Sequence, residues 1–317
     1  MKTTRLTLLL AATFALALSA SARLTIPAGA AWVAWKVPMS GHASICCNYD
    51  RGGRGCCDCD LESHGFSTRD DVASSGTMTV VAKMNGATVE RLRLVDGDCP
   101  VQRAGLQWLS PTPEESIDFL AEQVERDGSD RSSMLAAIAM HDSPAAEPRL
   151  EALSGAKYTN RIREDALFWI GQQGGDRGAR FLTDFIRDGD NGSLQKRAVF
   201  SLSESKGVGA TEALIDFARH HPRSDVRRES LFWLGQKAGA KAAAELRRAV
   251  DEDPDDSVRE QAVFAISQLP ADRSVPLLID LVKKNKSRKV RERAMFWLAQ
   301  TNDPRALSLI EQILVAK

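Results

Sequence analysis

Six cysteines and two histidines near the start of the chain are the side chains best suited to chemistry. Thiolates and imidazoles can hold zinc, an exposed thiol can react in redox chemistry, and cysteines of an exported chain can form structural disulfides. A structural zinc site normally shows two separated Cys-x2-Cys pairs, which the run Cys-Cys-x-Cys at 56–59 does not match. The pattern therefore favours disulfides, with a metal site and a redox-active thiol as alternatives. The residues of this cluster are Cys46, Cys47, Cys56, Cys57, Cys59 and Cys99, with His42 and His64.

The disulfide pairing is not determined by the sequence. Adjacent cysteines bridge each other only with strain, so Cys46 and Cys47, like Cys56 and Cys57, are expected to pair outward, for example across loop 51–55. Disulfides also fit the first 22 residues, which have the form of an export signal. Lys2 and Arg5 precede an apolar stretch, and an Ala-x-Ala site ends at residue 22.

Residues 1–22 are therefore expected to be cleaved, which leaves a periplasmic or extracellular protein with no stable membrane insertion. The chain has 42 lysine and arginine residues and 42 aspartate and glutamate residues, so it carries no net charge that would attract nucleic acid. His220 and His221 are expected to be an exposed, solvated loop pair without a nearby carboxylate cage. Because Gly-x-Ser-x-Gly, a phosphate-binding glycine loop and His-Glu-x-x-His are all absent from the sequence, we predict no catalytic residue, metal or cofactor.

A unit of 32 residues repeats without a gap through the second half of the chain, as the hexapeptides at 165–170, 197–202, 229–234, 261–266 and 293–298 show. A small residue and, two places later, a phenylalanine recur in each, with apolar residues four places to either side. This spacing predicts a helix, helix A, buried over most of its circumference. A degenerate sixth unit can be placed at 134–150. Such a period is typical of a solenoid.

A second apolar column follows sixteen residues after each small residue and predicts a second helix, helix B. Oppositely charged residues three apart are expected to pair on its exposed face, which would be a mixed-charge binding surface. We call these eight residues the helix B surface. They are Asp184 with Arg187, Asp216 with Arg219, Arg248 with Asp251, and Asp280 with Lys283.

Two further sets of residues recur in the repeat, and each set occupies one position of its own. Trp169, Trp233 and Trp297 occur in every second unit, either as large residues packed between layers or as exposed anchors for a partner. An arginine row begins helix A, with Gln195 as the exception, and is expected to tie neighbouring units to acidic loop residues. Its members are Arg163, Arg227, Arg259 and Arg291.

The segments at 226–231, 258–263 and 290–295 resemble the short bacterial HEAT-like repeat that also occurs in cyanobacterial bilin lyases. The resemblance covers residues 161–317 and implies an α-α superhelix of five to six repeats. It implies little about activity. HEAT-like enzymes that hydroxylate deoxyhypusine hold two irons with His-Glu dipeptides, and this sequence has none.

The region before the repeats is predicted to be a small disulfide-rich β domain. Residues 31–37 are rich in strand formers, and the strands 77–83 and 88–95 should form a hairpin at Asn85-Gly86, whereas 40–75 should be irregular. A helix begins at Thr112-Pro113 with a capping box and is expected to close the end of the solenoid. At the other end the last repeat is expected to be shielded by its own polar residues.

The predicted domains are the signal peptide 1–22, a Cys-rich β domain 23–109, a capping helix and linker 110–129, and the solenoid 130–317. The predicted function is a non-enzymatic scaffold of the cell envelope that binds a protein through the helix B surface. One alternative is a redox or metal sensor that acts through the cysteine cluster. Another is a lyase or oxidoreductase of the HEAT-like class, by analogy of fold alone.

Overall fold

The computed structural model describes residues 23–41, 43–46, 57, 59–62, 67–73, 75–126, 130–189, 191–237 and 239–315. The predicted export signal and Cys47, Cys56, His42 and His64 lie outside these residues. Within them, six strands precede thirteen helices, which confirms the mainly α architecture. No described helix is both long enough and apolar enough to span a bilayer. The strands are β1 (Trp32–Pro38), β2 (Ala43–Cys46), β3 (Ser67–Ala73), β4 (Thr77–Asn85), β5 (Thr88–Asp96) and β6 (Leu106–Trp108).

The larger sheet has the strand order β5-β4-β1-β6. The predicted hairpin is confirmed, because β4 and β5 pair antiparallel and Gly86 in their turn has a φ of 60°, a value that glycine adopts readily. The short strand β6 pairs parallel to β1 and was not predicted. The expectation of an irregular stretch at 40–75 was wrong in part, because β2 and β3 form a two-stranded antiparallel sheet there.

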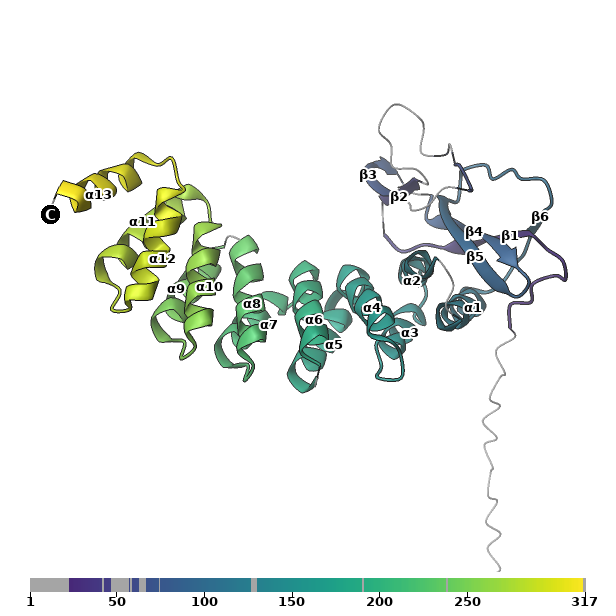
Figure 1. Cartoon of the computed structure of the whole chain (residues 1–317). Helices are drawn as coiled ribbons and strands as arrows, with labels where there is room; N and C mark the ends of the chain where they lie inside the picture. Colours follow the sequence, from purple (N-terminus) through teal and green to yellow (C-terminus); the bar gives the residue numbers. More distant parts are fainter. Residues whose placement is uncertain are drawn as a thin grey trace, which may run out of the picture.

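The helices stack in one curved row that leads away from the sheet (Figure 1). The first three are α1 (Pro113–Glu125), α2 (Arg131–Met140) and α3 (Ala146–Leu153), of which α2 and α3 form the degenerate unit. The A helices of the five repeats are α4 (Asn160–Gln173), α6 (Gly192–Glu204), α8 (Ser224–Lys237), α10 (Asp256–Ser267) and α12 (Arg288–Ala299). The B helices are α5 (Gly175–Asp188), α7 (Ala210–His220), α9 (Ala240–Glu252), α11 (Ala271–Lys284) and α13 (Pro304–Val315).

The predicted small-residue row is buried within the A helices, which contact one another along the stack. All five members are fully buried, and small side chains let neighbouring helix backbones approach closely. The row comprises Ala166, Ala198, Ser230, Ala262 and Ala294. Each of the first four B helices buries its predicted leucine, at Leu182, Leu214, Leu246 and Leu278. The register that the sequence indicates is therefore the register of the folded stack.

Helix α1 begins with the predicted capping box, in which Thr112 accepts from the Glu115 backbone N–H and Glu115 accepts from the Thr112 N–H. The helix nevertheless does not close the end of the stack by itself. Its apolar residues lie between the sheet and α2, and the Phe119 ring meets the Trp35 ring of β1 edge-on at 5.9 Å. One apolar core runs from the sheet to α13, so the sheet covers this end of the stack.

Candidate functional site

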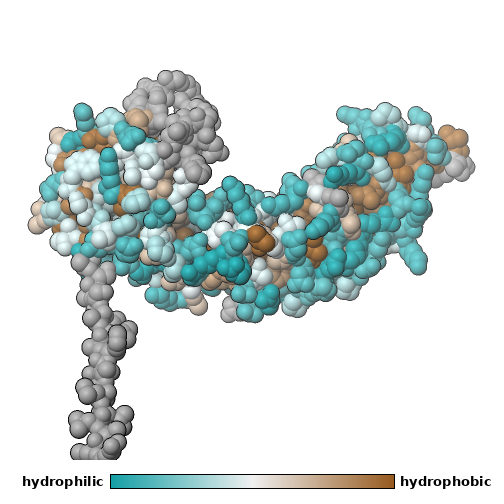
Figure 2. Space-filling view, turned by 180° about the vertical axis from the view of Figure 1, so that it is seen from behind, coloured by the Kyte–Doolittle hydropathy of each residue, from teal (hydrophilic) through white to brown (hydrophobic). Residues whose placement is uncertain are grey.

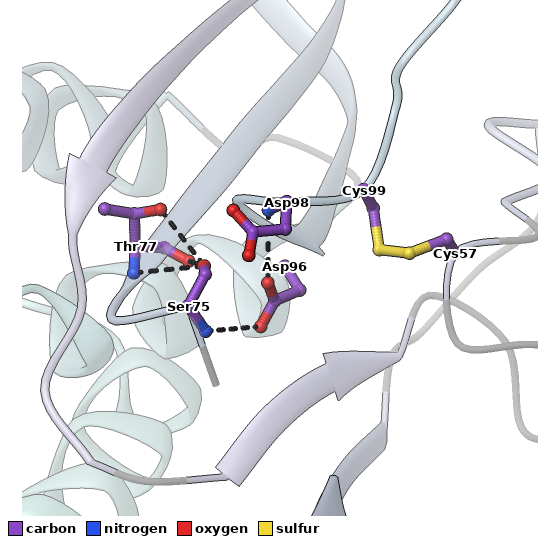
Figure 3. The surroundings of a disulfide bond; sticks show 6 residues. All are labelled: Cys57, Ser75, Thr77, Asp96, Asp98 and Cys99. Atoms are coloured by element: carbon purple, nitrogen blue, oxygen red, sulfur yellow. Dashed lines mark hydrogen bonds between the residues drawn. A yellow bond between two sulfur atoms is a disulfide. The ribbon is translucent and has the colours of Figure 1, made fainter. Parts of the chain in front are cut away.

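The cysteine cluster forms at least one disulfide that ties a loop to the sheet. Cys57 bonds to Cys99, 42 residues away, and Cys59 is disulfide-bonded as well (Figure 3). Cys57 therefore pairs outward and not with its neighbour, as expected. Cys99 is buried beside Trp32 in a small second core on the outer face of the sheet. Among the described residues no group of three or more His, Cys, Asp and Glu side chains could hold a metal ion.

Hydrogen bonds fix the turn that carries Cys99. Asp96, at the end of β5, accepts from the backbone N–H of Asp98 at 3.2 Å and of Ser75 at 3.5 Å (Figure 3). On the other side of the disulfide, the exposed Glu62 pairs with Arg103 at 2.7 Å and with Lys83 of β4 at 3.4 Å. The cysteine loop is thus held to the sheet by both a covalent bond and ion pairs.

A buried hydrogen-bond chain joins the sheet to the first helices. We call Trp35, Ser116 and His141 the sheet latch. Trp35 Nε1 donates to Ser116 Oγ at 2.7 Å, and His141 Nδ1 lies 2.6 Å from the carbonyl oxygen of Ala137. Since that oxygen only accepts, Nδ1 carries the proton, and Nε2 accepts from the Ser116 hydroxyl at 2.9 Å. Each polar atom of the latch therefore has a partner.

The sheet latch is structural although it contains a serine hydrogen-bonded to a histidine. Ser116 is fully buried and His141 is 2% exposed, so no substrate can reach the hydroxyl. Burial lowers the pKa of His141 to about 4, against an opposing hydrogen bond to Ala137, and keeps the imidazole neutral. No local sequence pattern marks the latch, because its members lie far apart in the chain.

The helix B surface differs from its predicted pairing. Only Asp184 and Arg187 form the expected pair, at 2.9 Å. Asp216 instead lies 2.9 Å from His220 Nδ1, and Asp251 pairs with Arg247. Asp280 binds Lys284 at 2.7 Å and Arg247 at 2.5 Å, and Lys283 is not its partner. Three of these contacts are made with a residue four places away on the same helix, and the contact between Arg247 and Asp280 joins two repeats.

Arg219 and Arg248 converge on Glu245, which is 3% exposed. Burial alone would raise the pKa of Glu245, but hydrogen bonds from the two guanidinium groups outweigh it and hold the pKa below its ordinary value. Arg219 lies on α7 and Glu245 on α9, so this contact joins two repeats. Two of the predicted partner-binding residues thus stabilise the stack itself.

The arginine row is structural, but only Arg227 binds an acidic loop residue of the neighbouring repeat, as predicted for all four members. Arg227 donates from Nε and Nη2 to the two carboxylate oxygens of Asp253, at 2.9 and 3.1 Å, and from Nη1 to the His221 carbonyl oxygen at 2.9 Å. Arg291, two repeats later, donates only to the carbonyl oxygens of Asn285 and Lys286. These bonds satisfy carbonyl groups where one repeat ends and the next begins.

An aromatic ladder runs along the A helices, and we define it by eight rings. They are Phe168, Trp169, Phe200, Phe232, Trp233, Phe264, Phe296 and Trp297. Consecutive rings have centroids 4.7 to 6.2 Å apart, so the contacts are continuous over five repeats. All eight rings are partly exposed, and Phe296 reaches 49%. The tryptophans pack on the phenylalanine of the preceding repeat or of their own helix, which confirms the packing interpretation while leaving an accessible aromatic face.

Two stacked pairs in the ladder have nearly the same geometry. Phe168 and Phe200 lie 6.2 Å apart at 9°, and Phe232 and Phe264 lie 6.2 Å apart at 5°. The Arg197 guanidinium covers the first pair, with its central carbon 5.2 and 5.1 Å from the ring centroids. Gln261 occupies the equivalent position at the second pair, and no cation–π contact is found there among the described residues.

A hollow of about 600 Å³ lies beside the second pair and is lined by Gln261, Phe264 and Trp297. Glu260 and Arg293 form an ion pair across its wall at 2.8 Å. The Trp297 indole N–H is buried without a hydrogen-bond partner, whereas Trp233 donates to Glu229 at 2.8 Å. Arg293 occupies the repeat position that Glu229 holds beside Trp233, so no carboxylate acceptor is available to the Trp297 N–H at that position.

The gapless helix pairs, their buried small-residue row and their inter-repeat arginines define an α-α solenoid of HEAT-like repeats. Residues 211–295 match the family model of HEAT repeats, and residues 290–315 match the model described as PBS lyase HEAT-like repeat. These matches confirm the resemblance that the sequence indicates. No curated protein matches this chain.

Parts of this chain are similar to solved structures at low sequence identity. A chain from the complex of CpcE and CpcF of phycocyanin lyase from Nostoc sp. PCC7120 is 24% identical over 49% of this chain and 99% of that chain, with a TM-score of 0.37. Human deoxyhypusine hydroxylase is 15% identical over 58% of this chain and 83% of that chain, with a TM-score of 0.29. YIBA of E. coli is 18% identical over 63% and 77%, with a TM-score of 0.40.

Proposed function

We propose that this chain is a non-enzymatic, protein-binding scaffold and that the aromatic ladder is its binding surface. The observation that carries the proposal is the continuity of eight partly exposed rings across five repeats. Aromatic side chains are favoured as anchors at protein interfaces. A rigid stack also presents them already in place, so that binding does not require the ordering of a flexible chain.

The partner that fits the ladder is an extended segment that places an arginine over Phe232 and Phe264. Arg197 supplies the template, because it covers the equivalent pair two repeats earlier. Glu229 and Gln261 hold the Arg197 position in the next two repeats, so a carboxylate and an amide are available to a guanidinium there. Apolar side chains of the same segment would contact the remaining rings.

The substitution Gln261→Arg tests this site, because it supplies from within the chain the guanidinium that the partner would bring. A photoreactive phenylalanine analogue at Phe296 would report the partner as a crosslinked adduct of the full chain in its own cells. We expect Gln261→Arg to lower the adduct yield roughly ten-fold, which corresponds to about 1.4 kcal/mol. Gln268→Arg makes the same change at an exposed end of the same helix and should leave the yield unchanged. Equal yields for both variants would contradict the proposed site.

The helix B surface is a second candidate for the same function. Asp184, Arg187 and Asp216 each keep more than half of their side-chain area exposed, at 66%, 57% and 61%. Reversing the charges of Arg219 and Arg248 would not test this surface cleanly, since both hold the buried Glu245. Arg187→Glu changes the surface without touching that cluster and is the suitable variant.

We further propose that the protein works outside the inner membrane, on the strength of the signal-like residues 1–22 and the Cys57–Cys99 disulfide. Amino-terminal sequencing should then find a mature chain that starts at Arg23, and a retained Met1 would contradict export. For the rival sensor function, thiol counting in the native protein is decisive. A sensor requires reactive thiols, whereas a structural cluster yields none.

A further inference from the structure

Hydrophilic side chains predominate on the face of the helical stack in Figure 2, except toward its tip. At the tip, Leu307 and Leu314 of α13 are 55% and 68% exposed, so the expectation that polar residues shield this end was wrong. Where the A helices meet, charged side chains pair across repeats, as Arg293 of α12 does with Glu260 of α10 at 2.8 Å. A charged side chain that stays unpaired at such a contact therefore calls for a reason.

Arg228 of α8 is such a side chain. It is partly buried and lines the hollow of about 600 Å³ beside Phe264, and no hydrogen bond or ion pair joins its guanidinium to any described residue. Its nitrogen atoms are not among the buried polar atoms, so the guanidinium opens into the hollow. A partly buried cation has lost part of its hydration without gaining an anion, and a bound anion would supply what is missing.

The acidic residues closest to Arg228 in the repeat pattern are already bound. Asp225, three residues earlier on α8, accepts two hydrogen bonds from Arg223 at 3.1 and 3.0 Å. Glu260 holds the Arg228 position one repeat later and pairs with Arg293. Among the described residues, Arg228 therefore lacks a counter-ion because its two candidates are taken by other arginines.

The remaining acidic side chains of the hollow are occupied as well. Asp255 accepts from the backbone N–H of Ser257 at 2.8 Å, and Asp256 binds Lys289 at 3.2 Å and also Arg259. Their negative charges stay in the hollow, so a doubly charged phosphate is repelled more strongly there than a single carboxylate. A carboxylate also has two oxygens that match the fork of a guanidinium. The anion that fits the hollow is therefore a carboxylate.

The hollow adjoins the place proposed for the arginine of the partner. Phe264 belongs to the second stacked ring pair and lines the hollow, and Gln261 lies at both places. An extended segment advances only about 3.3 Å per residue, so a residue next to that arginine, or one further along, can reach the hollow. We propose that the partner segment carries an aspartate or glutamate beside its arginine and that Arg228 binds this carboxylate. The inference rests on the proposed function of the ladder and adds the residue type that the ladder selects.

The photoreactive residue at Phe296 tests the proposal in the full chain in its own cells. Arg228→Met removes the guanidinium and should lower the adduct yield roughly ten-fold, because one hydrogen-bonded charge pair is lost. Arg228→Lys keeps the charge, as Lys196 does one repeat earlier, and should give an intermediate yield. Lys237→Met removes the same charge at the exposed end of α8 and should leave the yield unchanged. Mass spectrometry of the adduct should find Asp or Glu within two residues of an arginine in the attached peptide.

Urea unfolding of Arg228→Met separates binding from a structural role. The variant should be as stable as the wild type, since no bond to a described residue is lost. A clear loss of stability, an unchanged adduct yield, or an attached peptide with a phosphorylated residue or no acidic residue beside its arginine would each overturn the proposal. If Gln261→Arg still lowers the yield in that case, only the Arg228 site has failed. If Gln261→Arg also has no effect, the ladder has failed with it.

Discussion

Replacing Arg227 by methionine should destabilise the solenoid far more than the same change elsewhere in the arginine row. The Arg227 side chain is 10% exposed and the Asp253 side chain is 3% exposed. Methionine keeps the length and apolar contacts of the side chain but leaves the Asp253 carboxylate buried without its cation. Breaking a buried ion pair in this way typically costs about 3–5 kcal/mol, and we expect Arg227→Met to lower the free energy of unfolding by about 4 kcal/mol.

Arg291→Met is the matched control. Arg291 occupies the same repeat position, but its bonds are to the backbone carbonyl oxygens of Asn285 and Lys286, so the substitution strands no buried carboxylate. The loss of neutral carbonyl hydrogen bonds should cost only about 1 kcal/mol. Urea unfolding followed by circular dichroism measures both variants. Adding Asp253→Asn to Arg227→Met should recover part of the loss, because it removes the stranded charge.

Two outcomes would refute this reasoning. One is an equal loss of stability in Arg227→Met and Arg291→Met, which would mean that the carbonyl bonds alone matter. The other is a double variant that is less stable than Arg227→Met, which would mean that Asp253 stabilises the fold through contacts other than this ion pair.

Three further predictions concern stability. Burial lowers the pKa of His141 to about 4, so as the pH falls the unfolded chain binds a proton at this histidine before the folded chain does. The free energy of unfolding of the wild type relative to His141→Gln should therefore fall by about 3 kcal/mol as the pH drops from about 6.5 to about 4. A difference that does not vary with pH would contradict the buried neutral imidazole. Trp233→Phe should cost about 1 kcal/mol in urea unfolding because it loses a hydrogen bond, whereas Trp297→Phe removes a buried N–H without a partner and should be neutral or stabilising; equal losses would refute this distinction. Replacing both Cys57 and Cys99 by alanine opens a loop of 42 residues and should lower stability by about 4 kcal/mol, and a smaller effect than that of Trp233→Phe would show that the disulfide is dispensable.

The repeats could be predicted from the sequence because their evidence is local and occurs five times. The small residue, the phenylalanine and the flanking apolar residues of each unit lie within one helix, so their spacing alone indicates the buried face. The hairpin at Asn85-Gly86 was predictable for the same reason, since the turn and both strands are adjacent in the chain. Strand β6 has only three residues and pairs in parallel with a strand far earlier in the chain, so no local pattern marks it.

The features that could not be predicted depend on side chains brought together by the fold. Ser116 lies 81 residues from Trp35 and 25 from His141, and nothing in its own helix marks it as part of a latch. On the B helices, the charged residues do face outward, but Glu245 and Arg247 draw partners from the adjacent repeats. Pairing within one helix was inferred without those competitors, which explains why three of the four predicted pairs do not form.

We propose that the A helices carry the binding surface. The most direct test is a crosslinking map with the photoreactive residue placed at Phe296 on the ladder, at Arg187 on the helix B surface and at Val208 in a loop. We expect an adduct of a single mass at Phe296 and none at Val208. An adduct at Arg187 with none at Phe296 would contradict the ladder and transfer the function to the B helices.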